Sequence, residues 1–459
     1  MKILFISPEQ GISSKNATPV PPSALLYIAG LTPRKHQVEL LDLTYDKIDF
    51  NKKPDIVALS VMTLMAPISY EVADIYRKNG VKVVIGGHHP TAKPLEVKEH
   101  ADIVMMGEAE YTWEKFLDDF EKGSHYDFYI GGNAGTFTGH ELSGKVFRDE
   151  RKPDLKNLPY MRRELLTNKY IFDVIFTTRG CPYNCDFCSV TQFFGPKLRH
   201  RPVEEVLAEM EETKNMLYIS DDNCFFPYDY YSKLYDGMIN RFGNRKKWYA
   251  QGSLSITKEK NGDILLEKAA KSGMLSVFIG LESVNPKSLI GANAYAKMGL
   301  SKSKVDLEET RKSIKRIQSH GIMVWAFLII GFLEDTKETI SETMKFLDET
   351  GVLPLPIALS PLPGTKLEQK YADIMLPDRT WDMWDGGHAL FQHPNFTPRE
   401  FEEEVNKLRI QMYSTPRILK RIFSNKLSRI PLNIGVELGM KKSFKDIYEK
   451  VKIDGFVNA

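Results

Sequence analysis

The sequence predicts an α/β protein in three parts: a doubly wound parallel sheet, then six successive β/α units, then a mainly helical C-terminal region. The first two parts are predicted because short apolar runs alternate with helical patterns in two separate stretches of the chain. Length supports this division, since 459 residues exceed what one hydrophobic core usually supports. We expect domains at residues 1–125, 166–370 and 371–459, with 126–165 as a linker that contains a hairpin.

The first part alternates short apolar runs with amphipathic segments. The expected strands are Lys2–Ser7, Gln37–Leu43, Asp55–Ser60, Lys82–Ile85 and Asp102–Met106. The expected helices include Pro22–Thr32, Pro67–Asn79 and Tyr111–Glu121. Ligands of such sheets bind at the carboxyl ends of the strands. No GxGxxG or Walker phosphate loop occurs there, which argues against a dinucleotide or a nucleoside triphosphate.

The same alternation resumes at Ile171. The expected strands are Phe172–Thr178, Met216–Ser220, Trp248–Ser253, Leu275–Leu281, Met323–Ile330 and Pro356–Ser360. The expected helices include Pro202–Asn215, Asp263–Ser272, Leu307–His320 and Lys337–Thr350. In parallel barrels the chemistry lies at the carboxyl ends of the strands, so the loops that follow these six strands are candidate sites.

The C-terminal region begins with an aromatic group and ends with a basic stretch. Trp381, Trp384, Phe391 and Phe396 are expected to pack in a core, and lining a substrate pocket is the alternative. Phe401–Tyr413 has the pattern of an amphipathic helix. Residues 416–459 hold ten Lys or Arg against four Asp or Glu, which favours a solvated face over docking on a lipid surface or an acidic protein.

Composition limits the function classes. The chain is 42% hydrophobic and 27% charged, as expected for a soluble globular protein, and its net charge of +2 argues against general nucleic-acid binding. The N-terminal segment lacks the long apolar core and cleavage site of a signal peptide. No run of about 18 apolar residues occurs, so no transmembrane segment is expected. The reducing cytoplasm is the expected location.

Three of the four cysteines, Cys181, Cys185 and Cys188, lie within eight consecutive positions. Thiolates spaced by three and then two residues suit one iron–sulfur cluster. The fourth cysteine, Cys224, belongs to a different pattern and is expected to be a buried apolar residue, so one iron is left open to a small molecule. A structural zinc site, which usually needs four ligands, and disulfides are the less favoured alternatives.

The spacing of these cysteines, with Phe187 before the last one, resembles the motif of the radical S-adenosylmethionine (SAM) superfamily. The resemblance implies a partial, TIM-like (β/α)6 barrel and a 4Fe-4S cluster whose free iron chelates the amino and carboxylate groups of SAM. It also implies cleavage of SAM to a 5'-deoxyadenosyl radical by an electron from a reductant such as flavodoxin or ferredoxin. The single spare cysteine argues against subtypes that carry further clusters and against methylthiotransferases.

The resemblance extends to polar residues at the strand ends. Asp221, Asp222 and Asn223 match positions that contact the methionine amino group, and Glu282 matches a position that binds ribose or the amino acid end. Ile329 and Gly331 belong to a segment that matches an adenine-binding motif. The full set of expected SAM contacts is Phe187, Asp221, Asp222, Asn223, Gln251, Ser253, Glu282, Ile329, Gly331, Pro361 and Leu362. Taken singly, a carboxylate at a strand end is about as often a helix cap as a ligand.

The first domain has a helix start at Pro21-Pro22 and turns at Gly86-Gly87-His88 and Gly107-Glu108. In these features it resembles the Rossmann-like cobalamin-binding domain that precedes the barrel in many radical SAM enzymes. The expected cobalamin contacts are Pro8, Glu9, Ser60, Met62, Thr63, Leu64, Gly86, Gly87, His88, His89, Gly107 and Glu108. No Asp-x-His-x-x-Gly motif follows Ser7, so a histidine of that loop cannot replace the cofactor's own lower base. For the two histidines, a helix cap or solvent contact is an equally weighted alternative. A vestigial domain that binds no cobalamin is the alternative for the whole unit.

These cofactors imply a radical C-methyltransferase that removes hydrogen from an unactivated carbon, transfers a methyl group from methylcobalamin, and remethylates cobalamin with a second SAM. Cyclisation, coupling or rearrangement without methyl transfer is the alternative reaction. A cobalamin or iron–sulfur sensor is the alternative without catalysis. A peptide or protein side chain, a lipid, a tetrapyrrole and a natural-product intermediate all remain possible substrates.

Overall fold

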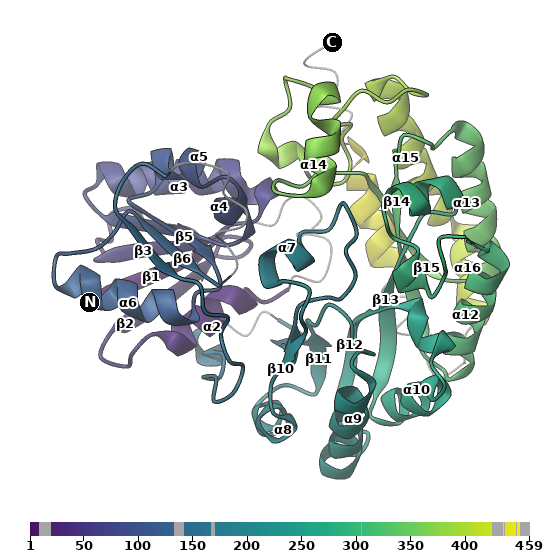
Figure 1. The fold of residues 1–459 in the computed structure, drawn as a ribbon, viewed down its shortest axis with the longest axis horizontal. Coiled ribbons are helices and arrows are strands. Elements are labelled where there is room, and N and C mark those ends of the chain that lie inside the picture. Colours follow the sequence, from purple (N-terminus) through teal and green to yellow (C-terminus); the bar gives the residue numbers. More distant parts are fainter. Residues whose placement is uncertain are drawn as a thin grey trace.

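The computed structural model describes residues 1–8, 20–132, 142–166, 170–303, 305–424, 435, 437–446 and 448–449. Two parallel-sheet bodies lie side by side, and the helices of the C-terminal region cover one end of the second body (Figure 1). The three-part α/β architecture expected from the sequence is confirmed.

The first body contains a seven-stranded parallel sheet in the order β2-β1-β3-β4-β5-β6-β7. Its strands are β1 (Lys2–Ser7), β2 (Gln37–Asp42), β3 (Ile56–Ser60), β4 (Lys82–Gly86), β5 (Ile103–Gly107), β6 (Phe128–Gly131) and β7 (Val146–Asp149). Its helices are α2 (Ser23–Leu31), α3 (Ala66–Lys78), α4 (His88–Ala92), α5 (Pro94–His100) and α6 (Glu110–Glu121), with 3-10 turn η1 (Thr63–Met65).

Alternation along the strands gives this sheet two buried faces. Leu4 of β1 packs in the cluster that contains Val72 of α3, whereas Phe5 packs in the cluster that contains Leu25 of α2 and Trp113 of α6. Successive strand side chains point to opposite faces, so helices on both sides are needed to bury them. The doubly wound arrangement is therefore confirmed.

The expected hairpin in residues 126–165 is wrong. β6 and β7 pair in parallel, with Phe128 opposite Val146, and both extend the first sheet beyond the expected limit at residue 125. A parallel pair needs a connection of about a dozen residues, which the stretch between Gly131 and Val146 supplies. The two short apolar runs indicated strands but could not fix their direction.

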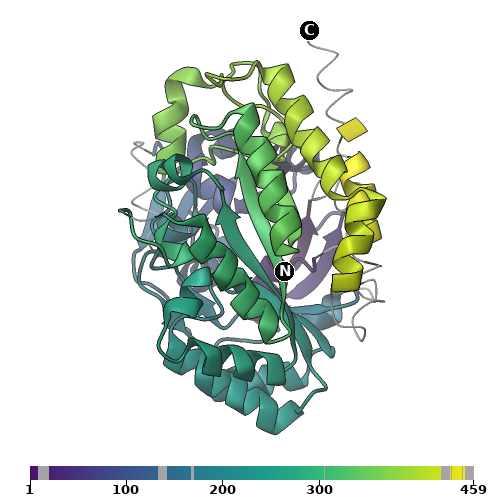
Figure 2. The ribbon, with the colours of Figure 1, turned by 90° about the vertical axis from the view of Figure 1, so that its right-hand side faces the viewer.

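The second body is a six-stranded parallel sheet in the order β15-β14-β13-β12-β11-β8, with β8 and β15 as unpaired edges, so the barrel is open as expected. Its strands are β8 (Asp173–Ile175), β11 (Met216–Ile219), β12 (Lys247–Gly252), β13 (Met274–Glu282), β14 (Met323–Ile330) and β15 (Leu353–Ala358). Helices α8 (Val203–Glu211), α9 (Tyr228–Phe242), α10 (Gly262–Lys271), α12 (Leu307–Ser319) and α13 (Lys337–Thr350) cover its outer face (Figure 2). Shorter elements are α11 (Pro286–Gly291), η3 (Arg163–Leu165), η4 (Leu254–Lys258) and η5 (Ala296–Met298).

One expected strand is split. Phe172–Thr178 divides into β8 and the short β9 (Thr178–Arg179), which leaves the sheet and pairs in antiparallel with β10 (Arg199–His200). Between β9 and β10 lie the cysteine loop, residues 180–189, and helix α7 (Val190–Phe194). We call β9 and β10 the stem of the cysteine loop.

The C-terminal region comprises α14 (Lys366–Tyr371), η6 (Ala372–Ile374), η7 (Trp381–Met383), α15 (Pro398–Met412) and α16 (Thr415–Ser424). Helix α15 begins at a capping box and covers β15, where Tyr413 donates to the carbonyl of Pro354 over 2.7 Å. Proline can occur in β15 because this strand is an edge. Trp384, Phe391 and Phe396 are buried, in agreement with the core interpretation.

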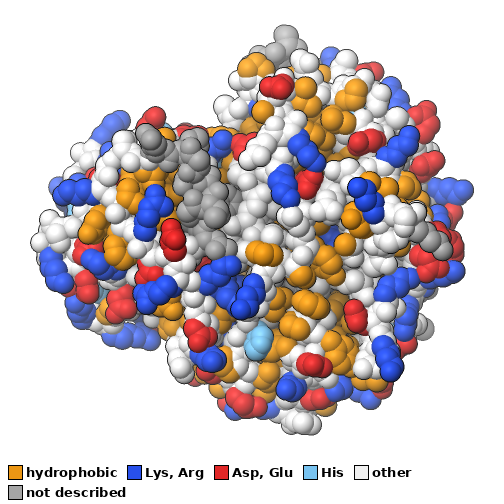
Figure 3. All heavy atoms as spheres, viewed as in Figure 1, with side chains coloured by type: hydrophobic (Ala, Val, Ile, Leu, Met, Phe, Trp, Pro, Cys, Tyr) orange, Lys and Arg blue, Asp and Glu red, His pale blue; other side chains and the backbone are white. Residues whose placement is uncertain are grey.

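In the described part of the basic stretch, arginine side chains bind carboxylates of the same chain. Arg417 binds Asp348, and buried Arg421 binds Glu437. Much of residues 416–459 lies outside the described residues. On the face in Figure 3 basic and acidic side chains are interspersed. Among the described residues, no helix combines the length and apolar character that a membrane span requires.

Candidate functional site

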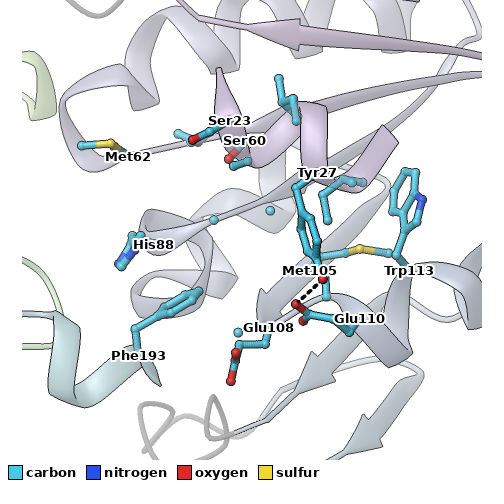
Figure 4. Close-up of a pocket in the computed structure, with 18 of the residues that line it drawn as sticks. Ser23, Tyr27, Ser60, Met62, His88, Met105, Glu108, Glu110, Trp113 and Phe193 are labelled. Carbon is cyan, nitrogen blue, oxygen red and sulfur yellow. Dashed lines mark hydrogen bonds between the residues drawn. The ribbon is translucent and has the colours of Figure 1, made fainter. Parts of the chain in front are cut away.

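A cavity of about 330 Å³ lies between the strand ends of the first sheet on one side and β9 and α7 on the other (Figure 4). Seven of the expected cobalamin contacts line it: Ser60, Met62, Gly86, Gly87, His88, Gly107 and Glu108. Asp222, expected to bind SAM, lines the same cavity. The volume falls within the range of ligand pockets, about 300–1,000 Å³.

Four expected cobalamin contacts do not line this cavity: Pro8, Thr63, Leu64 and His89. His89 is fully buried, and its ring nitrogens lie 2.9 Å from the Tyr70 hydroxyl and 3.4 Å from the Thr63 hydroxyl. It is thus a core histidine with both nitrogens paired, and it does not line this cavity. Glu9 lies outside the described residues.

Glycines let the backbone form the wall of the cavity. Gly87 has φ = +117°, and a Cβ atom at this position would approach the carbonyl oxygen of Val61 to 2.8 Å. A side chain is therefore excluded by conformation and by space. In the turn after β4, the backbone is therefore accessible to a ligand, and His88 follows directly in the chain.

His88 connects the two sides of the cavity. Its ring stacks on Phe193 of α7 with centroids 4.2 Å apart, and the two side chains face each other in Figure 4. Burial lowers the pKa of His88 to about 4, so the imidazole is neutral at pH 7. A neutral ring between the two domains can stack or accept a hydrogen bond without adding charge.

The three loop cysteines are free thiols, with Cys185 buried and the other two partly buried. Burial raises the pKa of Cys185 to about 11 and that of Cys181 to about 12. Within the described residues no three His, Cys, Asp or Glu side chains converge on one metal ion. Three cysteines with this spacing could each bind a different iron of one cluster, and iron binding would displace the thiol protons.

A lysine that sequence reasoning missed lies beside these cysteines. Lys297 bonds to Glu282, and its Nζ lies 5.5 Å from the centroid of the Phe187 ring. Burial opposes its charge, but attraction by Glu282 and Cys185 outweighs burial and raises the pKa of Lys297. Glu282 itself has φ = +62°, next to a register shift in β13. Such a bulge redirects a side chain, here toward Lys297.

The two aspartates that follow β11, Asp221 and Asp222, have different roles. Asp221 accepts hydrogen bonds from the amides of Thr177 and Thr178 and from the Tyr231 hydroxyl, at 2.6, 2.9 and 2.8 Å. It braces the strand that leads to the cysteine loop. Asp222 lines the cavity, and burial together with Asp221 raises its pKa to about 7.

A polar chain joins the strand ends to the cysteine loop. Asn223 donates to Ser253 over 3.1 Å, Ser253 lies 2.7 Å from Ser255, and the Tyr183 hydroxyl donates to Ser255 over 2.7 Å. Asn223 and Ser253, both expected SAM contacts, are thus brought together within reach of the cluster loop. Gln251 is exposed and donates to the Tyr218 hydroxyl.

The remaining expected SAM contacts lie at the ends of β14 and β15. Gly331 has φ = +111°, and a Cβ atom there would meet the Phe401 ring at 2.6 Å. Its amide donates to Asp335, and the neighbouring side chain of Ile329 is buried. The carbonyls of Pro361 and Leu362 accept from Trp384 and Thr365. These loops are therefore held in place by hydrogen bonds within the protein.

Beside the cavity, two carboxylates of the first domain meet two arginines of the stem. Arg179 Nη1 lies 2.7 Å from Glu108 Oε1 and 2.5 Å from Glu110 Oε1, and Arg199 Nη2 lies 2.8 Å from Glu108 Oε2. Tyr27 donates to Glu110 over 3.0 Å, as Figure 4 shows. Both oxygens of Glu108 are thus used by arginines, and Glu110 Oε2 is a buried atom without a partner.

The cavity has the character that a large ligand at the sheet end requires. A Cβ atom on Gly87 would collide with the Val61 backbone, so this turn carries no side chain, and one buried carboxylate oxygen, Glu110 Oε2, lacks a donor. The first feature permits close approach of a ligand to the backbone, and the second favours a ligand that carries N–H or O–H donors. A corrin ring can lie close to such a backbone turn, and its amide side chains supply N–H donors. The residues present therefore fit cobalamin as they fit a cluster.

Comparisons with known proteins agree with this geometry. Residues 11–117 match the B12 binding domain model, and residues 175–347 match the radical SAM superfamily model. The bacteriochlorophyllide d C-8(2)-methyltransferase of Chlorobaculum tepidum is 26% identical, covering 93% of this chain and 92% of that protein. The C-12(1)-methyltransferase of the same organism is 28% identical, covering 87% and 84%.

A solved structure shows the same fold. The radical SAM methyltransferase TsrM from Kitasatospora setae, with cobalamin and a [4Fe-4S] cluster bound, superposes with a TM-score of 0.67 at 15% identity, covering 93% of this chain and 89% of that chain. The chain therefore joins a B12-binding domain to a radical SAM domain and is homologous to cobalamin-dependent radical SAM methyltransferases.

Proposed function

We propose that the protein is a cobalamin-dependent radical SAM C-methyltransferase. The observation that carries the proposal is the shared cavity, which is lined by His88 and Gly107 of the first domain and by Asp222 and Arg179 of the second. Methyl transfer to a carbon radical requires both cofactors to face one substrate. A cavity bounded by both domains supplies that arrangement.

When bound, the cluster with SAM supplies a 5'-deoxyadenosyl radical, and cobalamin supplies the methyl group. Cys181, Cys185 and Cys188 would hold the cluster and leave one iron open. Asp222, Asn223 and Ser253 would orient SAM at that iron. The largely apolar walls of the cavity, among them Met105 and Phe193, would exclude water from the reacting carbon.

For the substrate, we propose a tetrapyrrole as the class to test first. Both Chlorobaculum relatives are named for bacteriochlorophyllide. The inner face of the barrel supports a flat ring system, because Tyr218, Tyr249 and Phe278 lie in one row on three neighbouring strands and are only partly buried. Aromatic faces stack well on flat conjugated rings. A peptide, a lipid and a natural-product intermediate remain the other arms of the test.

The experiment uses protein that is purified without oxygen, loaded with iron, sulfide and hydroxocobalamin, and reduced by flavodoxin or ferredoxin. SAM with a labelled methyl group is supplied with each substrate class in turn. We expect 5'-deoxyadenosine, S-adenosylhomocysteine and methylated product in equal amounts. A product without labelled methyl and without S-adenosylhomocysteine would favour cyclisation, coupling or rearrangement. No 5'-deoxyadenosine under any condition would leave a sensor.

A matched pair of cysteine variants controls this experiment. Cys185→Ala removes an expected cluster ligand, whereas Cys224→Ala alters a buried cysteine whose neighbour in space is Tyr235. We expect only the first variant to abolish 5'-deoxyadenosine. Equal activity of the two variants would contradict the assignment of the cluster loop. A cytoplasmic location is part of the same proposal.

A further inference from the structure

The stem of the cysteine loop is the feature from which a further inference follows. Arg179 of β9 and Arg199 of β10 are register partners across the stem, one before the loop and one after it. Both bind Glu108, which follows β5 of the first domain and lines the cavity. The loop that holds the cluster is therefore held at both of its roots by one carboxylate of the cobalamin domain.

The group is shielded from water and balanced in charge. The side chains of Glu108, Glu110, Arg179 and Arg199 are 1%, 6%, 11% and 13% exposed. Two carboxylates face two guanidinium groups, and attraction by Glu110 and Glu108 outweighs burial in holding the pKa of Arg179 above its usual value. Shielded contacts of this kind are screened little by salt and are directional, because the planar guanidinium has fixed donors.

The stem itself cannot easily shift relative to these contacts. Gly180 has φ = +96°, and a Cβ atom there would approach the carbonyls of Lys197 and Gly195 to 2.8 and 3.0 Å. The tip of the insertion is held as well, because Phe193 of α7 stacks on His88. A displacement of the stem would therefore carry the whole cysteine loop with it.

We propose that Arg179, Arg199 and Glu108 form a clamp that fixes the separation between the cluster and the cobalamin. Arg179 and Glu108 are positioning residues in this inference, which rests on the proposed function. Arg179 and Arg199 lie 71 and 91 positions beyond Glu108 in the chain and come from a different domain.

The test measures the separation directly. In protein loaded with both cofactors and then reduced, cob(II)alamin and the cluster are both paramagnetic, and their magnetic interaction falls steeply with distance. Electron paramagnetic resonance of the unaltered chain gives the reference splitting. We expect Arg179→Gln to lose or broaden that splitting, and Arg179→Lys, which keeps the charge without the planar fork, to restore part of it. The amounts of iron and cobalt in each variant are measured beside it.

Two further variants make the test decisive. Lys93→Gln breaks another ion pair of the first body, the 2.8 Å contact with Glu368 of α14 in the C-terminal region, and is expected to leave the splitting unchanged. Glu108→Gln keeps the size of the side chain and alters the clamp from the opposite domain. If Arg179→Gln fails to fold, the splitting of Glu108→Gln tests the clamp by itself. The same splitting in every loaded variant would overturn the clamp. Absence of cobalt from the unaltered chain would overturn the proposed function itself, and the clamp with it.

Discussion

The two parallel sheets of this molecule differ in how much of their surface they leave to a ligand. In the first sheet β3 is buried along almost its whole length, since helices cover both faces. In the barrel β12 alternates, with Trp248 buried against the outer helices and Tyr249 partly exposed on the inner face. The first sheet can therefore offer only its strand ends, whereas the barrel offers strand ends and an inner wall.

The largest expected effect is the loss of cluster binding when a cysteine of the barrel domain is replaced. Cys185→Ala is expected to remove essentially all cluster binding, because the remaining two thiolates leave a second iron without a ligand. Iron per chain and the optical spectrum of the cluster measure this loss. The Cys224→Ala control is expected to retain about four irons, and loss of iron from both variants would contradict the assignment.

The two faces of β12 provide the second prediction. Trp248→Ala is expected to cost about 3–5 kcal/mol in the free energy of unfolding, because it empties a fully buried site. Tyr249→Ala, next in the chain, is expected to cost about 1 kcal/mol and to weaken substrate binding instead. Urea denaturation and the KM for the substrate distinguish the two. Equal stability losses would contradict the difference between the faces.

Backbone contacts at the end of the first sheet give the third prediction. Gly87→Ala is expected to weaken cobalamin binding at least about tenfold, since the added Cβ meets the Val61 backbone and forces the turn open. Gly80→Ala is the matched control, because Gly80 also has a positive φ, +77°, but no atom lies within 4 Å of an added Cβ. Titration with hydroxocobalamin, followed by absorbance, compares them. Similar affinities would show that the turn does not touch the cofactor.

A further expected effect is the pH dependence contributed by His88. Its folded pKa of about 4 lies below the unfolded value of 6.5, so the unfolded chain binds the proton more tightly. The contribution of His88 to the free energy of unfolding is therefore full above pH 6.5. It decreases by about 2 kcal/mol as the pH falls from 6.5 toward 4. The free energy of unfolding of the native chain, compared with His88→Phe between pH 7 and pH 4.5, measures this difference. Parallel pH curves for the two proteins would refute the burial of a neutral imidazole.

Local patterns made much of this architecture predictable. β1 and β14 have the expected bounds, because apolar runs of strand length between turn residues are local signals. The cysteine loop was equally visible, since its spacing is set within eight positions. β15 began earlier than expected, because Pro354 and Pro356 resemble a strand boundary unless the strand is known to be an edge.

Contacts between distant segments could not be predicted in this way. Nothing in the sequence distinguishes His88, which lines the cavity, from His89, which is a core residue. Lys297 follows no motif and reaches the cluster loop only through the fold. Glu108 was expected to touch a ligand, and its pairing with arginines of the other domain depends on how the two bodies meet.

The proposed methyl transfer requires two cofactors bound to one molecule. The most direct measurement is the content of iron and cobalt per chain after anaerobic reconstitution with hydroxocobalamin. We predict about four irons and one cobalt per chain. Four irons without cobalt would contradict the methyltransferase proposal and leave a radical enzyme whose first domain serves another ligand.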